Sequence, residues 1–177
     1  MKALVLFAEG FEEIEAITPV DVLRRANIEV ITAGLSDLKV TGSHGISIAM
    51  DKLLDDVISR EDFDILILPG GLPGSHYLRD DGRVIDLIRH MNAQEKLIAA
   101  ICAAPVALEE AGIIKNKKVT SHPSKESELK SAVYTAKRVE VDGRIITAKG
   151  AGCAMEFSLV ILREMGLTLE AHKLAEA

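Results

Sequence analysis

The sequence predicts an α/β fold, a three-layer sandwich with a mainly parallel sheet. Three short, continuously apolar runs, at residues 4–7, 65–68 and 97–101, have the composition of parallel strands that are covered on both faces. Amphipathic stretches with helical spacing lie between such runs, at residues 17–26 and 84–91. This alternation is typical of βαβ units, so we expect helices on both faces of one sheet.

Shorter segments complete the predicted fold. Residues 28–33 and 119–120 have the composition of further strands, and Asp142-Gly143 is a two-residue hairpin signal between residues 139–141 and 145–147. A small antiparallel element should therefore join the sheet. Residues 40–49 alternate around two glycines, which predicts a short hairpin at one edge, and residues 155–165 predict a closing helix. The length of 177 residues, without a linker or repeat, predicts a single domain over residues 1–177.

Composition and charge exclude several partners. Hydrophobic residues make up 48% of the chain and charged residues 27%, as in a soluble globular protein. The net charge is −6 without a basic run, and aromatic residues are only 3%, so we expect neither nucleic acid nor an anionic membrane as a partner. The longest apolar stretch, residues 97–108, contains a proline and is shorter than the ~20 residues of a membrane helix. The apolar run at residues 3–8 passes directly into acidic residues rather than a cleavage site, so we expect a cytoplasmic protein.

The segment around Cys102 carries the clearest chemical signal. The chain has two cysteines, too few for a disulfide framework, and Cys102 lies where an apolar strand turns into a helix. Such an elbow holds a side chain in a tight, exposed turn, and the amides at a helix start lower the pKa of a thiol. The pattern predicts a reactive thiolate, although a small buried cysteine at an alanine-rich strand end would have the same sequence.

Three other segments place polar groups near the same sheet edge. Gly70 and Gly71, after the strand at 65–68, can turn their backbone amides into the crevice, or they can simply form an ordinary βα turn. One carboxyl among Glu12, Glu13 and Glu15 can face inward, where a neighbouring thiolate would keep it protonated, and the others would be solvated charges at a helix start. His122 follows another short strand and can act as a general acid or base, or be an ordinary loop histidine.

Together these motifs resemble the DJ-1/PfpI superfamily, and its DJ-1 branch closely. The resemblance extends over nearly the whole chain and rests on five segments in the family order: Glu12-Glu13-Ile14-Glu15, Leu68-Pro69-Gly70-Gly71, Ala100-Ile101-Cys102-Ala103-Ala104-Pro105, Val119-Thr120-Ser121-His122-Pro123 and Gly150-Ala151-Gly152. It implies a flavodoxin-like fold, as in the class I glutamine amidotransferases. It also implies Cys102 as the nucleophilic and oxidisable thiol, Glu15 as its protonated partner, the backbone of Gly71 and Ala103 as oxyanion-hole donors, and His122 as the nearby histidine. No metal and no cofactor is implied.

The chain departs from the family pattern at three places. Ala103 stands where the PfpI proteases carry the histidine of a triad, and no histidine neighbours Glu156 as in the glutamine amidotransferases, so neither activity is expected. The arginine that binds an anion beside Arg25 in the DJ-1 branch is replaced by His44. An anion site formed by Arg25 and His44 is therefore the weakest of the implied features.

The resemblance implies a cysteine-dependent, glutathione-independent glyoxalase, or the related protein deglycase, that acts on methylglyoxal-type 2-oxoaldehydes and their adducts. A redox sensor or oxidative-stress chaperone that works through oxidation of Cys102 would use the same residues and is the alternative, and a cysteine peptidase ranks last. A homodimer is expected from the resemblance and from the broad apolar faces of residues 17–26. We expect Cys153 to pack under a helix start rather than to act as a resolving thiol.

Overall fold

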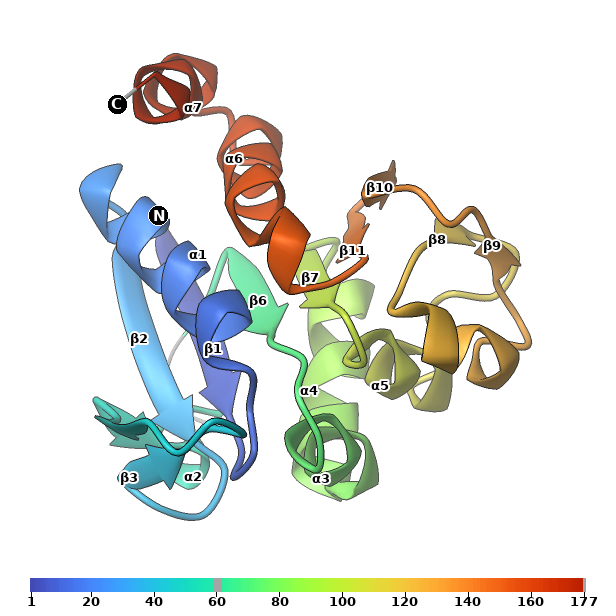
Figure 1. The fold of residues 1–177 in the computed structure, drawn as a ribbon, viewed down its shortest axis with the longest axis horizontal. Coiled ribbons are helices and arrows are strands. Elements are labelled where there is room, and N and C mark those ends of the chain that lie inside the picture. Colours follow the sequence, from blue (N-terminus) through green and yellow to red (C-terminus); the bar gives the residue numbers. More distant parts are fainter. Residues whose placement is uncertain (59–61, 177) are drawn as a thin grey trace.

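A seven-stranded sheet forms the centre of the molecule in the computed structural model, which describes residues 1–58 and 62–176 (Figure 1). The strand order is β10-β11-β7-β6-β1-β2-β5. All neighbouring strands are parallel except β10 and β11, which form an antiparallel pair, so the predicted, mainly parallel α/β sheet is confirmed. The strands are β1 (Lys2–Phe7), β2 (Glu29–Gly34), β5 (Lys52–Leu53), β6 (Ile65–Leu68), β7 (Leu97–Ile101), β10 (Val139–Asp142) and β11 (Ile145–Ala148).

The central strands are apolar along their whole length because each contributes side chains to two hydrophobic cores, one on each face of the sheet. In β1, the side chains of Ala3, Val5 and Phe7 pack in one core, and those of Leu4 and Leu6 pack in the other. Successive side chains of a strand point to opposite faces, so one continuous apolar run serves both cores. The strands β6 and β7 alternate in the same way.

Helices form the two outer layers. α1 and α6 lie side by side and pack together on one face of the sheet, where α7 extends their layer (Figure 1). α2, α3, α4 and α5 pack against the other core. Within residues 1–58 and 62–176, no helix combines the length and the apolar character needed to span a bilayer. The helices are α1 (Glu13–Arg25), α2 (Leu54–Val57), α3 (Gly74–Asp80), α4 (Gly82–Ala93), α5 (Pro105–Glu110), α6 (Ala154–Glu164) and α7 (Thr168–Ala175), and two 3-10 turns are η1 (Pro123–Glu128) and η2 (Ala151–Cys153).

Three predicted segments differ from the structure in detail. The strand expected at 119–120 is β8 (Lys118–Val119), which pairs with β9 (Val133–Tyr134) in a separate two-stranded sheet. The hairpin expected at 40–49 is β3 (Lys39–Thr41) with β4 (Ser47–Ala49), and it also forms its own sheet.

The third difference is the loop of the β10–β11 hairpin, which lies one residue later than predicted. Asp142 remains in the strand, paired with Ile145, so the two-residue loop is Gly143-Arg144. The carboxylate of Asp142 accepts a hydrogen bond from the backbone N–H of Lys118 at 2.8 Å. This contact with β8, which lies far away in the sequence, keeps Asp142 out of the loop.

The strand order reverses at β1, because β2 lies on one side of it and β6, which comes later in the chain, on the other. In open α/β sheets, ligands bind beyond the carboxyl ends of the strands at such a reversal. The loops after β1 and β6 meet there, since the N–H of Glu12 donates to the carbonyl of Gly70 at 2.9 Å. The fold therefore has its natural site at the edge where Cys102 was expected.

Candidate active site

Cys102 lies in a tight turn between β7 and α5. Its backbone φ of 63° is in the left-handed region, which residues other than glycine rarely adopt. Both backbone polar groups of Cys102 are hydrogen-bonded. Its N–H donates to the Ala148 carbonyl at 2.8 Å, and its carbonyl accepts from the His122 N–H at 2.7 Å. The thiol is free and only partly buried. Neighbouring segments thus force the backbone into a strained elbow that presents the sulfur at the end of the sheet.

Glu15 is the carboxyl that faces Cys102. It lies in the first turn of α1, is 1% exposed, and contacts the thiol of Cys102 through a hydrogen bond. Its Oε2 accepts from the Gly70 N–H at 3.0 Å, and the Ala151 N–H also points to the carboxylate. Burial, which outweighs these hydrogen bonds, together with the charge of Glu12 raises the pKa of Glu15 to about 7. A proton on Glu15 is therefore available near neutral pH.

The backbone amides of Gly71 and Ala103 both point to the sulfur of Cys102. Gly71 has a φ of 93°, and a side chain at this position would also collide with the backbone of Glu12. At Gly70 a Cβ would run into the Glu15 carboxylate and would lie 2.6 Å from the Cβ of Cys102. The two glycines after β6 therefore allow the loop to approach the thiol closely enough for its amides to face the sulfur.

The pKa of Cys102 differs from the sequence prediction. Burial, followed by the charge of Glu15 and the hydrogen bond between the two side chains, raises the pKa of the thiol to about 12, although the Ala103 and Gly71 amides act in the opposite direction. The prediction of a pKa lowered by the helix start is wrong, because α5 has only 6 residues and begins at Pro105, whereas the carboxyl touches the thiol. Above about pH 7 the pair has lost one proton and the two acids share one negative charge, since a second charge in contact with the first is unfavourable.

His122 supports the turn through its backbone rather than through its ring. Its N–H holds the Cys102 carbonyl, as described above, and its Nδ1 lies 2.8 Å from the hydroxyl of Ser124 in η1. The imidazole is exposed. The structure therefore brings the backbone of His122 to the elbow and directs the ring to the adjacent turn.

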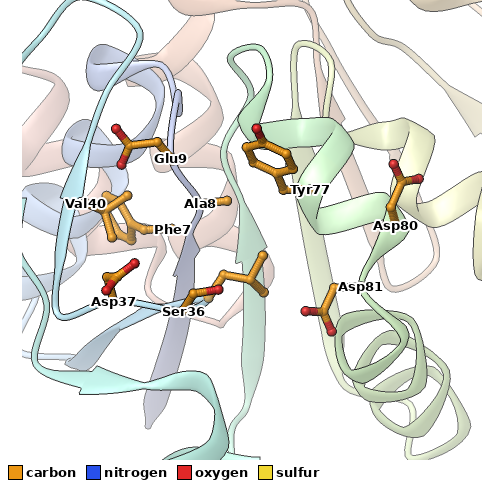
Figure 2. Close-up of a pocket in the computed structure, with 10 residues that line it drawn as sticks. Phe7, Ala8, Glu9, Ser36, Asp37, Val40, Tyr77, Asp80 and Asp81 are labelled. Atoms are coloured by element: carbon orange, nitrogen blue, oxygen red, sulfur yellow. The ribbon is translucent and has the colours of Figure 1, made fainter.

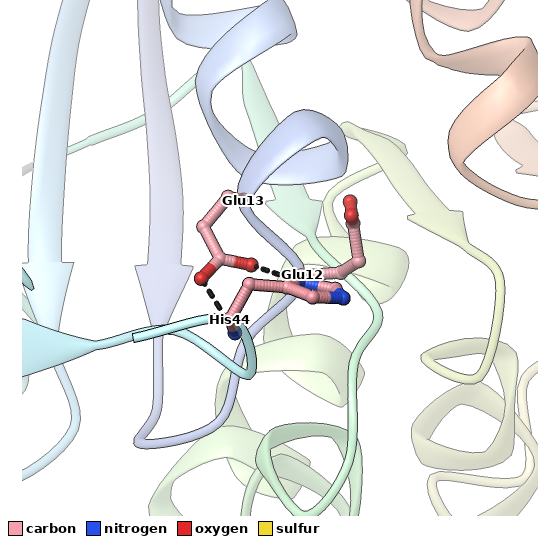
Figure 3. Close-up of side chains that lie close together, drawn as sticks. All are labelled: Glu12, Glu13 and His44. Carbon is pink, nitrogen blue, oxygen red and sulfur yellow. Dashed lines mark hydrogen bonds and ion pairs between the residues drawn. The ribbon is translucent and has the colours of Figure 1, made fainter. Parts of the chain in front are cut away.

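His44, in the loop between β3 and β4, lies beside the first turn of α1, where it pairs with Glu13. Its Nδ1 is 2.9 Å from Oε2 of Glu13, and its N–H donates to Oε1 at 2.8 Å (Figure 3). Burial alone would raise the pKa of Glu13, but the hydrogen bonds from His44, from the Glu13 amide and from the Ile46 N–H lower it to about 2. The carboxylate in turn raises the pKa of His44. Glu13 thus fastens the β3–β4 hairpin to α1.

Arg25 lies in the last turn of α1, whereas Glu13, which pairs with His44, lies at the other end of this helix. Its guanidinium pairs with Asp21 at 2.7 Å, one turn earlier. Within one chain, the structure does not bring Arg25 and His44 together, because a helix of this length separates its two ends by about 18 Å.

One group of the described residues has side-chain atoms spaced closely enough to surround a metal ion. Ligand atoms of Glu12, Glu13 and His44 lie within 4.8 Å of one another (Figure 3). Both oxygens of Glu13 already accept hydrogen bonds from the hairpin, and Oε2 of Glu12 accepts from the N–H of Glu15 at 2.8 Å. The group therefore serves as a helix cap and a hairpin anchor.

The sequence did not indicate which amides hold the carboxyl of Glu15. The amides of Gly70 and Ala151 hold the carboxyl of Glu15 from two loops that are far apart in the sequence. The only signal for them was the glycine content of residues 70–71 and 150–152, which marks backbone that can approach another group closely. Glycine content does not show which group is approached.

Comparison with known proteins agrees with the motifs. A sequence profile of the DJ-1/PfpI family matches residues 1–164. Protein DJ-1alpha of Drosophila melanogaster is 40% identical over 178 residues, which span 99% of this chain and 82% of that protein. The Parkinson disease protein 7 homolog of Danio rerio is 39% identical over 168 residues, which span 93% of this chain and 89% of that protein.

Solved structures show the same fold at similar identity. The crystal structure of DJ-1beta from Drosophila melanogaster superposes with a TM-score of 0.95 at 41% identity, and the match covers 99% of this chain and 95% of that one. Toxoplasma gondii DJ-1, described as oxidized, superposes with a TM-score of 0.93 at 35% identity, covering 99% and 96% of the two chains. With the Cys102 elbow, the buried Glu15 and these matches in agreement, the chain belongs to the DJ-1/PfpI family.

Proposed function

We propose that the protein is a cysteine-dependent, glutathione-independent glyoxalase for methylglyoxal-type 2-oxoaldehydes, with deglycase activity on their adducts with amines, thiols and guanidinium groups. The observation that carries the proposal is the pair of Cys102 and Glu15, which shares one proton in a site where two amides face the sulfur. This arrangement can supply a nucleophile, a proton carrier and donors for an oxyanion without any cofactor.

The first step is addition of the Cys102 thiolate to the aldehyde carbon of methylglyoxal. A bond forms between sulfur and carbon, and the carbonyl electrons move to the oxygen, which takes the proton of Glu15 to give a hemithioacetal. The amides of Gly71 and Ala103, which face the sulfur before attack, are close enough to the new bond to stabilise negative charge during the addition.

The second step moves a proton within the adduct. Glu15, now ionised, removes the hydrogen from the former aldehyde carbon while the ketone oxygen takes up the proton of the adjacent hydroxyl group, and Glu15 then delivers its proton to the neighbouring carbon of the resulting enediol intermediate. The product is a lactoyl thioester of Cys102. Water then hydrolyses the thioester to lactate and restores the thiol and the carboxyl pair. Glu15 is preferred over His122 as the proton carrier, because it contacts the thiol whereas the His122 ring contacts Ser124.

Freshly reduced protein should convert methylglyoxal to lactate, and Cys102→Ser should abolish the conversion. Cys153→Ser is the matched control, since that thiol is buried at the start of α6. A reduced, folded wild-type protein that forms no lactate would remove the enzyme from consideration and leave the redox function.

A redox sensor or oxidative-stress chaperone is the second candidate. Oε1 of Glu15 is buried without a hydrogen bond of standard geometry, and a protonated oxygen there could donate to an oxygen added to the sulfur. Mild peroxide should then add two oxygens to Cys102 before it modifies Cys153. A cysteine peptidase stays last, because Ala103 cannot act as a base.

A homodimer is part of the proposal, on a surface that only partly overlaps the one the sequence indicated. Within residues 17–26, Val20, Val22 and Leu23 are buried within the chain, whereas Ile17 remains 39% exposed. Ile14 at 55% exposure and Ile46 at 56% remain uncovered on α1 and on the adjacent hairpin. We propose that a second copy covers them, and sedimentation showing a monomer at micromolar concentration would exclude this assembly.

A further inference from the structure

Lys125 is a buried lysine that the proposed reaction does not use. It lies in η1, shortly after His122, and is only 7% exposed. Its Nζ lies 2.8 Å from Oε1 of Glu128 and 3.1 Å from Nε2 of His76 on α3. A buried ammonium group is costly unless other groups bind it, so these two contacts hold the side chain in one place.

The contact between Lys125 and His76 has a fixed direction. An ammonium group can only donate hydrogen bonds, so Nε2 of His76 is the acceptor and the neutral ring carries its proton on Nδ1. Glu128 strengthens the link between η1 and α3, because its Oε2 lies 3.6 Å from Nη1 of Arg79, which is also on α3. Lys125 thereby joins η1 to the first turn of α3.

These two elements lead to different atoms of Cys102. On the η1 side, the carbonyl of His122 accepts from the N–H of Lys125 at 2.9 Å, and the N–H of His122 binds the Cys102 carbonyl. On the α3 side, the N–H of Ser75 donates to the Gly71 carbonyl at 2.9 Å, and the Gly71 amide points to the sulfur. The link made by Lys125 therefore closes a ring of contacts that begins and ends at Cys102.

The position of the Gly71 amide relative to the sulfur depends on this ring. Gly71 has no side chain of its own to anchor it, so its peptide is held through its neighbours. The loop after β1 supports one of them, because the N–H of Glu12 binds the Gly70 carbonyl, and α3 supports the other side. A hydrogen-bond donor stabilises an oxyanion best when it is held in place before the charge develops.

We propose that Lys125 is a positioning residue of the Cys102 site, which through His76 and α3 fixes the Gly71 amide against the sulfur. The inference rests on the proposed function, in which that amide stabilises the negative charge formed during addition to the aldehyde. Lys125 acts through His76 and not on the substrate.

Lys125→Met and His76→Leu test the proposal. Methionine is unbranched and apolar, and Glu128 keeps its contact with Arg79, so Lys125→Met should fold with a stability near that of the wild type. We expect kcat for methylglyoxal to fall about five- to 30-fold in each variant, with KM changed less than about twofold, because a displaced donor weakens stabilisation of the transition state rather than substrate binding. The double variant should lose no more than either single variant, since both remove the same contact.

Two further variants of α3 serve as controls. His76→Gln keeps an acceptor for Lys125 and should retain kcat within about twofold, whereas a general disturbance of α3 would lower kcat in this variant too. Tyr77, the next residue along the helix, is 48% exposed, and its ring lines a pocket beside Glu9, just after β1 (Figure 2). Tyr77→Leu should therefore have the kcat of the wild type.

Alkylation of Cys102 by iodoacetamide separates an effect on the Gly71 amide from an effect on the thiol. This reaction displaces iodide and forms no oxyanion, so Lys125→Met should be alkylated at the wild-type rate at each pH. An alkylation rate that falls as much as kcat would show that Lys125 acts on the ionisation of Cys102 and Glu15, and the proposal would be wrong.

Amide hydrogen exchange examines the position of Gly71 without turnover. We expect the N–H of Gly71 to exchange about three- to tenfold faster in Lys125→Met and His76→Leu than in the wild type. His76→Gln and Tyr77→Leu should match the wild type. A wild-type protein that forms no lactate would remove the proposed function, and the exchange rates would still decide the role of Lys125. Unchanged exchange at Gly71 in Lys125→Met would overturn the inference, as would an unchanged kcat where the wild type forms lactate.

Discussion

Glu13 and Glu15 occupy the same turn of α1 and yet have opposite ionisation behaviour. Both are buried, at 7% and 1% exposure, and burial raises the pKa of each. At Glu13 the donors of the β3–β4 hairpin outweigh burial and lower the pKa to about 2, whereas at Glu15 the thiol and two amides do not, and the pKa rises to about 7. The donors supplied by other segments, and not burial alone, therefore decide which carboxyl keeps its proton.

The space around the two carboxyls differs as well. A Cβ at Gly42 would lie 2.8 Å from Cγ of Glu13, so the hairpin packs directly on that side chain. A Cβ at Gly150 would lie 3.8 Å from Oε1 of Glu15 and 3.9 Å from the sulfur of Cys102, at ordinary contact distance. Glu13 is therefore enclosed by structure, and Glu15 has room beside it for a reagent.

Replacing Glu15 and Glu13 by glutamine, one at a time, should give the largest difference in kcat between the two positions. Glu15→Gln removes the proton shared with Cys102, and we expect kcat for methylglyoxal to fall about 10²- to 10⁴-fold. Glu13→Gln should leave kcat nearly unchanged, because its carboxyl faces the hairpin. Steady-state lactate formation by both folded variants measures the difference, and equal losses would show that Glu15 has no special place in the chemistry.

The pH dependence of turnover should follow the pair of Glu15 and Cys102. The reactive form has lost the first proton of the pair, so kcat/KM should rise with pH about tenfold per unit below about 7 and then level off. Glu15→Gln should lose this inflection and Glu13→Gln should keep it. A profile that is flat between pH 5 and 8 in the wild type would contradict the shared-proton description.

Stability should depend on pH in opposite directions at the two positions. The folded pKa of Glu15 lies above the ordinary 4.5, so the folded state binds the extra proton, and its contribution to stability is lost as pH rises through about 7. The folded pKa of Glu13 lies below 4.5, so its contribution is present above that pH and is lost as pH falls towards about 2.

Urea unfolding can separate these two contributions. We expect Glu15→Gln to be ~1–3 kcal/mol more stable than the wild type at pH 8 and little different at pH 4. Glu13→Gln should be ~1–2 kcal/mol less stable at pH 7, because the hairpin loses an ionised acceptor. A Glu15→Gln variant that is destabilised at pH 8 would mean that the ionised carboxylate is well accommodated in the fold.

Replacing Gly42 or Gly150 by alanine should distinguish an effect on packing of the fold from an effect on substrate access to the sulfur of Cys102. Gly42→Ala should destabilise the fold by ~1–3 kcal/mol, since the added methyl would displace the Glu13 carboxylate from its hydrogen bonds with the hairpin. Gly150 has an extended backbone that alanine can adopt, so Gly150→Ala should fold normally. We expect it to lower kcat/KM for phenylglyoxal about three- to tenfold more than for glyoxal, because the added methyl narrows the space beside the sulfur. An equal effect on both substrates would place the reagent elsewhere.

The smallest effect is expected at Cys153. Cys153 is 4% exposed, and Glu15 contacts the thiol of Cys102 instead, so Cys153→Ser should retain turnover. A non-reducing peptide map of oxidised wild-type protein should show no disulfide between Cys102 and Cys153. A mapped disulfide would overturn this and make the protein a two-thiol switch.

The sequence by itself was sufficient for the layers of the fold and for the position of Cys102. Apolar runs such as residues 65–68 and 97–101 specify strands buried on both faces, and the period of residues 84–91 specifies a helix, because these signals are local and repeat. The elbow at Cys102 was also readable, since a strand that passes through small residues into a proline must turn there. The loop at Gly143-Arg144 was missed by one residue, because Asp142 is held by Lys118, which is distant in the sequence.

Only the tertiary structure decided how the carboxyls, the thiol and the loops interact. From the residues alone, one of the three carboxyls was expected to face inward and Glu12 and Glu13 to be solvated, but Glu13 is buried as well. The three are separated by contacts from four segments: the N–H of Glu15 meets Glu12, the hairpin meets Glu13, and the separate loops at Gly70 and Ala151 meet Glu15. The raised pKa of Cys102 depends on the same kind of contact. Such contacts join residues separated by tens of positions, and they depend on the direction in which each side chain leaves a folded helix or loop, which no local pattern encodes.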